Sequence, residues 1–479
     1  KHFDEEFKWK LLIALTENYD LDEVLDGVLI KSENWQALNL LLNKYSDKVQ
    51  TIYIDPPYNT GNDGFLYKDK YQHSSWLTMM DNRLRLAKGL MNNEGIIFTS
   101  IDDNELEYLK IVLSVIFGSK NYLETFLWNN TSTPPSLSKV SRKNVEYILS
   151  FVKLNLKGYF KGRYSIGEDA PLLNSGNPYR ILTFPQGKVE FKIPDGIYKK
   201  SKKNRIELLD DVYVICGKNK NAFRMKLESK WTQDKLNQEI KNGTIFLVKS
   251  EAFSIRYQRV RLENYWITPD KYIDNIFLEK KAGVGTNEDA NKELNLMNLL
   301  FESYPKPSSL IYYFIRMQTD IKDYVIDFFA GSGTTAHAVM KLNQEDGGKR
   351  KFILVEMADY FDTVIIPRIK KLSYSFDWKG GKPQNSNGIG VFFKYHILEQ
   401  YEDSLENIEF SDFQTSLYDF KDYFVKYMLD WETKKSNTFL NIDKLQDPFN
   451  YKLKIFNNYL FKTVNVDLVE TFNYLLGLF

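Results

Sequence analysis

Residues 324–356 read YVIDFFAGSGTTAHAVMKLNQEDGGKRKFILVE, and this stretch decides the fold. The apolar run 324–329 predicts a buried strand, residues 334–342 predict a helix, and the apolar run 352–356 predicts a second strand. A strand, a helix and a strand joined by short links form a right-handed unit whose two strands are parallel. The sequence therefore predicts an α/β domain built on a mostly parallel sheet.

A second apolar run, VQTIYI at residues 49–54, also predicts a buried strand, and it ends in Asp55-Pro-Pro-Tyr58. Each proline fixes its φ angle and lacks an N–H, so the backbone of this turn can hold a carbonyl pointing outward. Asp55 adds an acidic oxygen, and Tyr58 adds an aromatic face for stacking. The turn therefore has the groups needed to hold a flat ring with an amino group, such as a base pulled out of a nucleic-acid stack.

A glycine pair joins the first predicted strand to its helix, within Asp327-Phe-Phe-Ala-Gly-Ser-Gly-Thr-Thr335. Gly331 and Gly333 let a ligand approach the backbone, and the start of the helix presents free N–H groups. A plain tight turn or a dinucleotide fold is the alternative, but a dinucleotide-binding turn has a third glycine where Ala336 stands, and no Walker lysine follows. Glu356 ends the next strand, where a carboxylate can hold ribose hydroxyls. These features favour a nucleoside without phosphates, such as S-adenosylmethionine.

The composition is that of a globular protein, since 43% of the 479 residues are hydrophobic and 27% are charged. The net charge is only +1, but residues 126–300 hold 30 Lys and Arg against 19 Asp and Glu, so this segment carries +11 and the rest −10. A basic segment is typical of contact with a polyanion, while a solvated lysine-rich surface is the simpler alternative. Short strand-like runs with basic and aromatic residues between them fill the same segment.

Cysteines, histidines and apolar runs indicate where the protein is located and whether a disulfide, a metal site or a membrane span is expected. Cys216 is the single cysteine, which excludes an intrachain disulfide and favours a cytoplasmic location; its apolar neighbours predict a buried strand thiol. The four histidines form no ligand-spaced cluster, so no metal site is expected. No apolar run is long enough to span a bilayer, so no membrane partner is expected.

The remaining chain gives coarser expectations. Residues 8–48 look largely helical with a break at 30–35; a helix is predicted over about 75–92, a strand over 96–101 and a helix up to about residue 117. The run Asp102-Asp-Asn-Glu105 resembles a capping box, which explains its carboxylates as cap and surface groups rather than as a catalytic site. Residues after about 390 mix helical and strand patterns, are acidic at 402–419, and give no fold assignment.

The two strand-end motifs together resemble those of the DNA amino-methyltransferases, which methylate N6 of adenine or N4 of cytosine. That family carries (Asp/Asn/Ser)-Pro-Pro-(Tyr/Phe/Trp), matched by Asp55–Tyr58, and Phe-x-Gly-x-Gly, matched by Phe329–Gly333. The order of the motifs, with the basic segment between them, resembles the circularly permuted β class. Residues 55–61, 352–363 and 466–477 also look like segments of the Mod subunits of type III restriction–modification systems.

This resemblance implies a Rossmann-like methyltransferase domain that is split by a mixed α/β target-recognition insertion and followed by a C-terminal region. The implied domains are a helical extension (1–30), the two halves of the methyltransferase core (31–125 and 301–385), the target-recognition domain (126–300), and a C-terminal domain able to dock a partner (386–479). The implied reaction is methyl transfer from S-adenosylmethionine to adenine N6 of a flipped base in double-stranded DNA. The implied partners are DNA, a second copy of the chain and a Res-type helicase–nuclease subunit.

The resemblance also assigns roles to single residues. Asp55 and the Pro56 carbonyl would accept the two N–H bonds of the target amine, and Tyr58 would stack on the flipped ring. Lys306-Pro307 matches a Lys-Pro element that lies near the methionine end of the cofactor in the family. The predicted catalytic residues are Asp55, Pro56, Pro57 and Tyr58. The predicted cofactor-binding residues are Lys306, Pro307, Asp327, Phe329, Ala330, Gly331, Ser332, Gly333, Thr334 and Glu356, and no metal ligand is predicted.

Several alternatives stay open. The target base could be cytosine N4, because Asp55 only favours adenine on the ground that serine is the commoner residue among the cytosine enzymes of the family. The chain could be an orphan adenine methyltransferase without a nuclease partner, or it could serve mainly as the recognition and assembly subunit of a restriction complex. A dinucleotide oxidoreductase is disfavoured by the missing third glycine and by the Asp55–Tyr58 motif.

Overall fold

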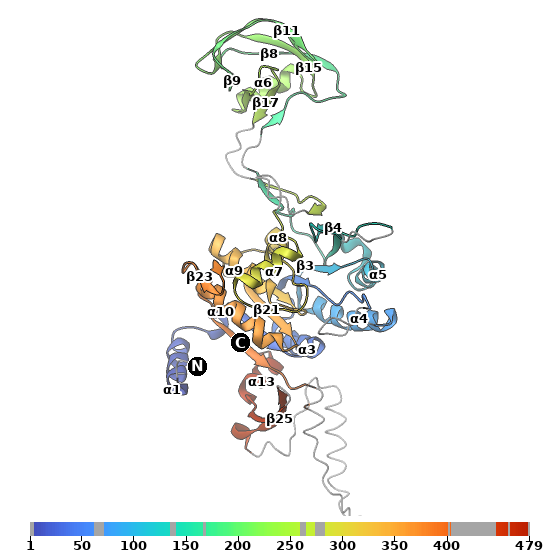
Figure 1. Ribbon diagram of the computed structural model, residues 1–479, viewed down its shortest axis with the longest axis vertical. Coiled ribbons are helices and arrows are strands. Elements are labelled where there is room, and N and C mark those ends of the chain that lie inside the picture. Colours follow the sequence, from blue (N-terminus) through green and yellow to red (C-terminus); the bar gives the residue numbers. More distant parts are fainter. Residues whose placement is uncertain are drawn as a thin grey trace, which may run out of the picture. The chain divides into compact units, whose positions relative to one another are not determined.

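The stretch 324–356 folds as the sequence predicts. In the computed structural model, strand β20 (Tyr324–Asp327), helix α9 (Thr334–Asp346) and strand β21 (Lys351–Glu356) follow one another, and the two strands pair in parallel. Figure 1 labels α9 and β21. The structure describes residues 4–61, 71–134, 140–165, 169–258, 265–273, 283–400, 403, 447–457 and 460–477. The chain divides into two compact units, one comprising Lys1–Gly162 with Pro269–Phe479 and the other Arg163–Thr268.

The main unit is built on a nine-stranded sheet with the order β19-β4-β5-β3-β2-β20-β21-β1-β24. The six strands from β3 to β24 are parallel to their neighbours, whereas β5 pairs antiparallel with both β3 and β4. This confirms the predicted α/β fold with a mostly parallel sheet. The other strands are β1 (Gly27–Lys31), β2 (Val49–Ile54), β3 (Met91–Ile101), β4 (Tyr122–Asn129), β5 (Val145–Val152), β19 (Tyr272–Ile273) and β24 (Phe393–Ile397).

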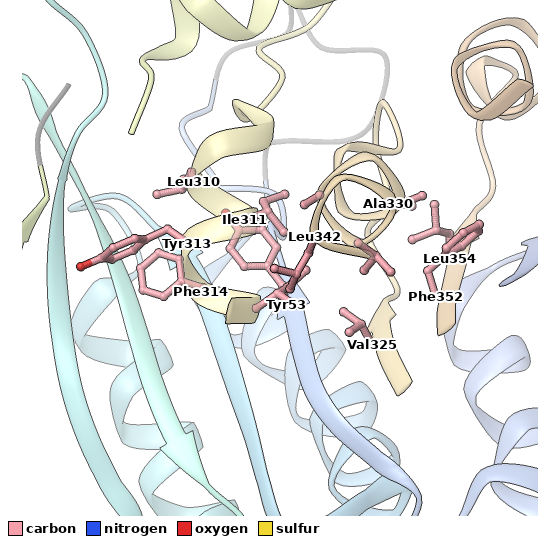
Figure 2. Close-up of a cluster of buried hydrophobic side chains, with 14 of the residues drawn as sticks. Tyr53, Leu310, Ile311, Tyr313, Phe314, Val325, Ala330, Leu342, Phe352 and Leu354 are labelled. Carbon is pink, nitrogen blue, oxygen red and sulfur yellow. The ribbon is translucent and has the colours of Figure 1, made fainter. Parts of the chain in front are cut away.

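Alternating side chains of the strands divide the core into two layers, because successive side chains of a strand point to opposite faces. On β2, Ile52 and Ile54 join a cluster with helices α3, α4 and α5, while Tyr53 joins a cluster with α7, α8, α9 and α10. Figure 2 shows the second cluster, in which the ring centroids of Tyr53 and Phe314 are 6.5 Å apart. The sheet therefore lies between two helical layers. The helices are α3 (Asn34–Tyr45), α4 (His73–Leu90), α5 (Leu106–Phe117), α7 (Asn287–Leu296), α8 (Ser308–Gln318) and α10 (Ile366–Tyr374).

Strand β1 corrects the expectation that residues 8–48 are largely helical. Helices α1 (Glu5–Thr16), α2 (Leu21–Val24) and α3 account for most of that segment, but Gly27–Lys31 forms a strand between β21 and β24. Its residues are almost all buried, so the pattern alternates neither like an exposed strand nor like a surface helix. The helical expectation is wrong for residues 27–29, and residues 30–31, expected as part of the break at 30–35, complete the strand.

The unit Arg163–Thr268 has its own hydrophobic core, formed around Phe184, Phe223 and Phe246. It contains a seven-stranded sheet, β10-β13-β14-β9-β16-β17-β7, a four-stranded sheet, β11-β12-β15-β8, the pair β18-β6, and helix α6 (Gln233–Lys241). The unit is narrower than the expected insertion at 126–300, because β4, β5, β19 and α7 belong to the main unit. Its role in target recognition stays a prediction. The strands are β6 (Arg163–Ser165), β7 (Ala170–Pro171), β8 (Tyr179–Phe184), β9 (Val189–Phe191), β10 (Gly196–Tyr198), β11 (Ser201–Lys203), β12 (Ile206–Leu208), β13 (Val212–Ile215), β14 (Lys218–Asn219), β15 (Phe223–Glu228), β16 (Ile245–Val248), β17 (Ile255–Gln258) and β18 (Tyr265–Ile267).

Two further expectations are wrong. Cys216 is exposed at a turn after β13, with a φ of +53°, and is not a buried strand thiol. Glu105, expected to be a capping or surface residue before α5, is fully buried, and its carboxylate accepts a hydrogen bond from Asn59. The placement of both residues depends on contacts with residues far away in the sequence, which a local pattern cannot show.

The C-terminal region adds to the main unit. Beyond β24, the structure describes a hairpin of β25 (Lys452–Asn457) and β26 (Leu460–Asn465), followed by α13 (Leu468–Leu476). Helix α13 packs against α3, and its Tyr474 is buried in the same cluster. The acidic segment 402–419 lies outside the described residues apart from Asp403. Within the described ranges, no helix has the length and apolar character needed to cross a membrane.

Candidate active site

The two motifs found in the sequence lie at the same edge of the main sheet. Strand β2 ends at Ile54 and continues into Asp55–Tyr58, and its neighbour β20 ends at Asp327 and continues into the glycine turn. The next strand, β21, ends at Glu356. Ligands bind at the carboxyl ends of the strands in open α/β sheets, so this edge is the candidate active site.

Four residues form a charged cluster at this edge: Asp55, Tyr58, Glu146 and Lys306. Lys306 Nζ lies 3.1 Å from Asp55 Oδ2, 3.1 Å from Glu146 Oε2, and 4.8 Å from the centroid of the Tyr58 ring. The Tyr58 hydroxyl donates a 2.8 Å hydrogen bond to Glu146 Oε2, and the Asn130 amide donates a 2.8 Å hydrogen bond to Glu146 Oε1. Lys306, expected to contact the cofactor, is thus placed against the Asp55–Tyr58 turn.

Burial and charge act against each other in this cluster. Burial raises the pKa of Asp55; the Lys306 ammonium opposes that shift and Glu146 adds to it. Burial also acts to raise the pKa of Glu146, but Lys306 and the hydrogen bonds from Asn130 and Tyr58 outweigh it and hold that pKa below its usual range. Burial disfavours the Lys306 ammonium, yet the two carboxylates raise its pKa above the ordinary value. With all three groups ionised, the cluster carries a net charge of −1.

Asp55 keeps one acceptor for a ligand. Its Oδ2 pairs with Lys306, whereas Oδ1 is buried and accepts no hydrogen bond from any residue that the structure describes. A buried acceptor without a donor costs on the order of 1–3 kcal/mol, so a ligand N–H at this position would be favoured.

Buried groups fix the backbone of the Asp55–Tyr58 turn. The indole of Trp76, which is completely buried in α4, donates a 2.8 Å hydrogen bond to the Pro57 carbonyl. Asn59 has a φ of +57° and donates a 2.6 Å hydrogen bond to Glu105 Oε1, which His73 Nδ1 also approaches at 2.7 Å. These contacts hold the turn before and after Tyr58, so the ring has a defined position.

The glycine turn has the backbone geometry that the sequence predicts. Gly331 and Gly333 have φ angles of +54° and +77°, a region that glycine adopts without strain. A Cβ atom on Gly333 would lie 3.2 Å from Ile365 Cγ2, so this position is also crowded. Gly333 is the N-cap of α9, whose first N–H groups have no partner within the helix.

Glu356 and Asp327 support the glycine turn through hydrogen bonds. Glu356 Oε2 accepts the Gly331 N–H at 2.9 Å, and burial raises the pKa of its carboxyl group. Asp327 Oδ1 accepts the Phe329 N–H at 3.0 Å, and its Oδ2 accepts the Thr335 hydroxyl at 2.5 Å. Burial raises the pKa of Asp327 to about 7. The expected contact between Glu356 and a ribose stays a prediction.

A buried arginine ties the glycine turn to the Lys306-Pro307 segment. The Thr334 hydroxyl donates a 3.1 Å hydrogen bond to the Lys306 carbonyl. Arg368 of α10 is 1% exposed, and its Nη1 donates to Ser332 Oγ and Thr334 Oγ1, both at 3.0 Å. Glu293 of α7 pairs with the same guanidinium at 3.3 Å. The turn and the loop before α8 are therefore held together by buried polar groups.

The other predicted residues lie around these groups. Pro56 and Ala330 are buried, Phe329 is partly buried against the cluster with α3, α4 and α5, and Pro307 is the N-cap of α8. The sequence alone did not point to Glu146, Trp76, Thr335 or Arg368 as part of the site. A single acid within the apolar strand VEYILSFV was the one signal available for Glu146. Among the described residues, no group of three or more His, Cys, Asp or Glu side chains has a metal-binding arrangement.

A family model and several known proteins are similar to this chain over most of its length. The family model N6_N4_Mtase, described as DNA methylase, matches residues 49–366. The Mod subunit of the type III restriction–modification enzyme StyLTI from Salmonella typhimurium is 28% identical in an alignment that covers 81% of this chain and 63% of that protein. The EcoP15I Mod subunit from Escherichia coli is 30% identical in an alignment that covers 69% of this chain and 58% of that protein.

A shorter relative is covered more completely. The type II methyltransferase M.KpnI from Klebsiella pneumoniae is 30% identical in an alignment that covers 74% of this chain and 88% of M.KpnI. By contrast, the chain spans less than two thirds of the length of either Mod subunit, at 63% and 58%.

Proposed function

This chain belongs to the N6_N4_Mtase family of DNA methylases, which its residues 49–366 match, and we propose that it methylates adenine N6 of a flipped base in double-stranded DNA. The methyl donor in this proposal is S-adenosylmethionine. The observation that carries the proposal is Asp55 Oδ1, a buried acceptor without a donor among the described residues, at a Pro-Pro-Tyr turn beside the glycine turn.

The residues around the glycine turn fit such a donor. The positive φ angles of Gly331 and Gly333 leave bare backbone at the start of α9, and two carboxylates, Asp327 and Glu356, lie next to it. Negative charge here complements a sulfonium and an α-amino group. Bound S-adenosylmethionine would supply an electrophilic methyl group. Ser332, Thr334 and Arg368 would hold the turn in place while that donor binds.

The Asp55–Tyr58 turn would prepare the target amine. The lone pair of an adenine amine is delocalised into the ring, so the nitrogen is a poor nucleophile. Hydrogen bonds from its two N–H groups to Asp55 Oδ1 and the Pro56 carbonyl would direct the lone pair toward the methyl carbon. The nitrogen–carbon bond forms as the sulfur–carbon bond breaks, and the nitrogen then loses one proton, to Asp55 or to water. Stacking on Tyr58 is worth on the order of 1–3 kcal/mol.

We also propose the enzyme system to which the chain belongs, its cellular location and its partner subunits. The similarity to Mod subunits supports a modification subunit of a type III restriction–modification system. The proposal adds a cytoplasmic location, a homodimer and a Res-type helicase–nuclease subunit as the partner. Co-purification of such a chain would support the complex. A homodimer that methylates DNA without it would support an orphan methyltransferase.

Digestion of modified DNA to nucleosides, followed by mass spectrometry, tests the proposed base. The protein would be incubated with S-adenosylmethionine and genomic DNA from a host that lacks DNA methylation, so that the unknown target sequence is present. N6-methyladenine is the expected product. N4-methylcytosine would instead assign the chain to cytosine, and no modified base would contradict the methyltransferase proposal.

A further inference from the structure

We propose that Glu146 and Lys306 are positioning residues for methyl transfer: Lys306 keeps Asp55 ionised and oriented, and Glu146 holds both Lys306 and Tyr58. This inference rests on the proposed function. In this role Lys306 acts on Asp55 and Tyr58, which hold the target base, and not on the cofactor as expected from the sequence. Neither residue has to touch the base or the cofactor for this role, because both act through Asp55 and Tyr58.

The geometry links the four residues in one network. Glu146 Oε2 receives both the Tyr58 hydroxyl at 2.8 Å and the Lys306 ammonium at 3.1 Å, so one carboxylate oxygen fixes the ring and the cation together. The same ammonium reaches Asp55 Oδ2 at 3.1 Å, which leaves Oδ1 directed elsewhere. The side chains of Lys306 and Glu146 are only 7% and 10% exposed, so solvent screens these interactions weakly.

Glu146 and Lys306 are each held in place by the backbone around them. Glu146 lies in β5, in the interior of the sheet, and pairs across the strands with Trp128 of β4. Lys306 lies in the segment before α8, and its carbonyl accepts the Thr334 hydroxyl of the glycine turn. The cation therefore connects the base side of the site to the cofactor side through its own backbone.

Charged and titratable groups face Asp55 from each neighbouring element. They are Lys306 before α8, Glu146 of β5, Asp327 of β20, and the phenols of Tyr58 and Tyr53. Lys306 is the cation of this set, and it stabilises the ionised form of Asp55. Glu146 has the opposite direct effect, because a second carboxylate disfavours ionisation of the first.

The two substitutions should therefore shift the pH dependence in opposite directions. Lys306→Met leaves two carboxylates without the cation, so Asp55 ionises only at higher pH and the acid limb of the rate profile moves up. Glu146→Gln removes the like charge and leaves Lys306 to Asp55 alone, so the acid limb moves down. Shifts of about one pH unit or more are expected for charges at this distance. Gln keeps an acceptor for the Tyr58 hydroxyl, which preserves the ring position.

The test measures single-turnover transfer of tritiated methyl groups to unmethylated genomic DNA across pH in the unmodified protein and both variants. Glu6→Gln and Lys10→Met are the matched controls, because this pair lies on α1, outside the segment 126–300, at 2.6 Å, and is much more exposed. Both controls should keep the profile of the unmodified protein. Opposite shifts in the two site variants support the inference. Equal losses at every pH, or shifts in the same direction, would overturn it, since a merely structural role has no reason to move the profile.

A second readout separates this inference from the proposed function. If the unmodified protein transfers no methyl group to adenine or cytosine, the proposed function fails, and the pH profile has no meaning. The Asp55 carboxyl would then be titrated by carbon-13 NMR in the same three proteins, with Asp55→Asn to assign its signal. Opposite movements of that titration support the cluster as inferred, and an unmoved titration overturns it.

Discussion

At the scale of single residues, Tyr58 combines stacking with a fixed orientation. Tyr58→Ala removes the ring, so methyl transfer should fall by roughly 5- to 150-fold, which corresponds to about 1–3 kcal/mol of stacking free energy. Tyr58→Phe keeps the ring and removes only the hydroxyl that Glu146 accepts, so its effect should be smaller. Tritium-methyl assays and calorimetry with S-adenosylmethionine would measure rate and cofactor affinity. Unchanged transfer by Tyr58→Ala would rule out the stacking role.

Asp327 predicts a pH dependence of cofactor binding. With a pKa of about 7, its carboxyl is ionised to roughly one tenth at pH 6 and nine tenths at pH 8. The ionised form favours a cationic ligand, so affinity for S-adenosylmethionine should rise several-fold over this range. In Asp327→Asn, the single carbonyl can still accept the Phe329 N–H, and the amide N–H can donate to the Thr335 hydroxyl. The extra rise should disappear in this variant, because it has no carboxylate at this position. The amino group of the cofactor titrates alike in both proteins, so equal slopes by calorimetry would contradict this role.

Both motifs could be predicted from the sequence, but the side chains that contact them from other elements could not. Asp55–Tyr58 and Gly331–Gly333 could be predicted because proline restricts the backbone locally and glycine permits the left-handed angles that other residues avoid. Glu146 and Arg368 could not, because each reaches the site through strand or helix packing that no local pattern records. Lys306 was identified, but its contact with Asp55 appears only when the segment before α8 is placed beside β2.

At the scale of elements, the glycine turn determines how α9 begins. Gly333→Ala places a Cβ at a φ of +77° and 3.2 Å from Ile365 Cγ2, so the turn must shift. The left-handed conformation alone costs about 1–2 kcal/mol. We expect weaker cofactor binding together with lower stability, measured by calorimetry and thermal unfolding. Gly347→Ala is the matched control, because Gly347 has a φ of +71° at the other end of α9 and no atom within 4 Å of the added Cβ.

Gly347→Ala causes the same kind of backbone strain as Gly333→Ala but no close contact, so a comparison of the two variants separates these effects. Gly347→Ala should lower the stability less than Gly333→Ala does and should keep the affinity for S-adenosylmethionine. If both variants bind the cofactor as well as the unmodified protein, the glycine turn does not form the cofactor site.

Turn signals, not length, decided which elements could be predicted from the sequence, since β20 has only four residues. The strands β2, β20 and β21 and the helices α4 and α9 combine clear apolar patterns with glycine or proline at their ends. Strands β1 and β24 were missed because each pairs only with strands far away in the chain, so the sequence around them contains no partner. Short strands of this kind are defined by tertiary pairing.

At the scale of the whole molecule, charge is divided unevenly between the two units. The unit Arg163–Thr268 contains 20 Lys and Arg against 12 Asp and Glu, a net +8, although the chain as a whole carries +1. Binding to duplex DNA should therefore weaken steeply with salt. Replacing Lys202 and Lys218, which are exposed in this unit, by alanine should weaken binding alike on all sequences. The salt slope should fall by about 1 for each phosphate that is no longer neutralised.

Exposed lysines of the main unit provide the control for that experiment. Lys120→Ala and Lys370→Ala change the net charge of the chain by the same amount outside the basic unit. Fluorescence anisotropy at several salt concentrations measures the slopes. A slope that falls equally in both pairs of variants would mean that the basic unit is not the preferred DNA-binding surface.

The central claim is that the chain methylates adenine N6 and that Asp55 is required for it. Single-molecule sequencing of DNA from a methylation-free host that expresses either the unmodified protein or Asp55→Ala tests both parts at once. The expected result is N6-methyladenine at one recurring sequence with the unmodified protein and none with Asp55→Ala. Methylated adenine in both strains, or in neither, would contradict the claim.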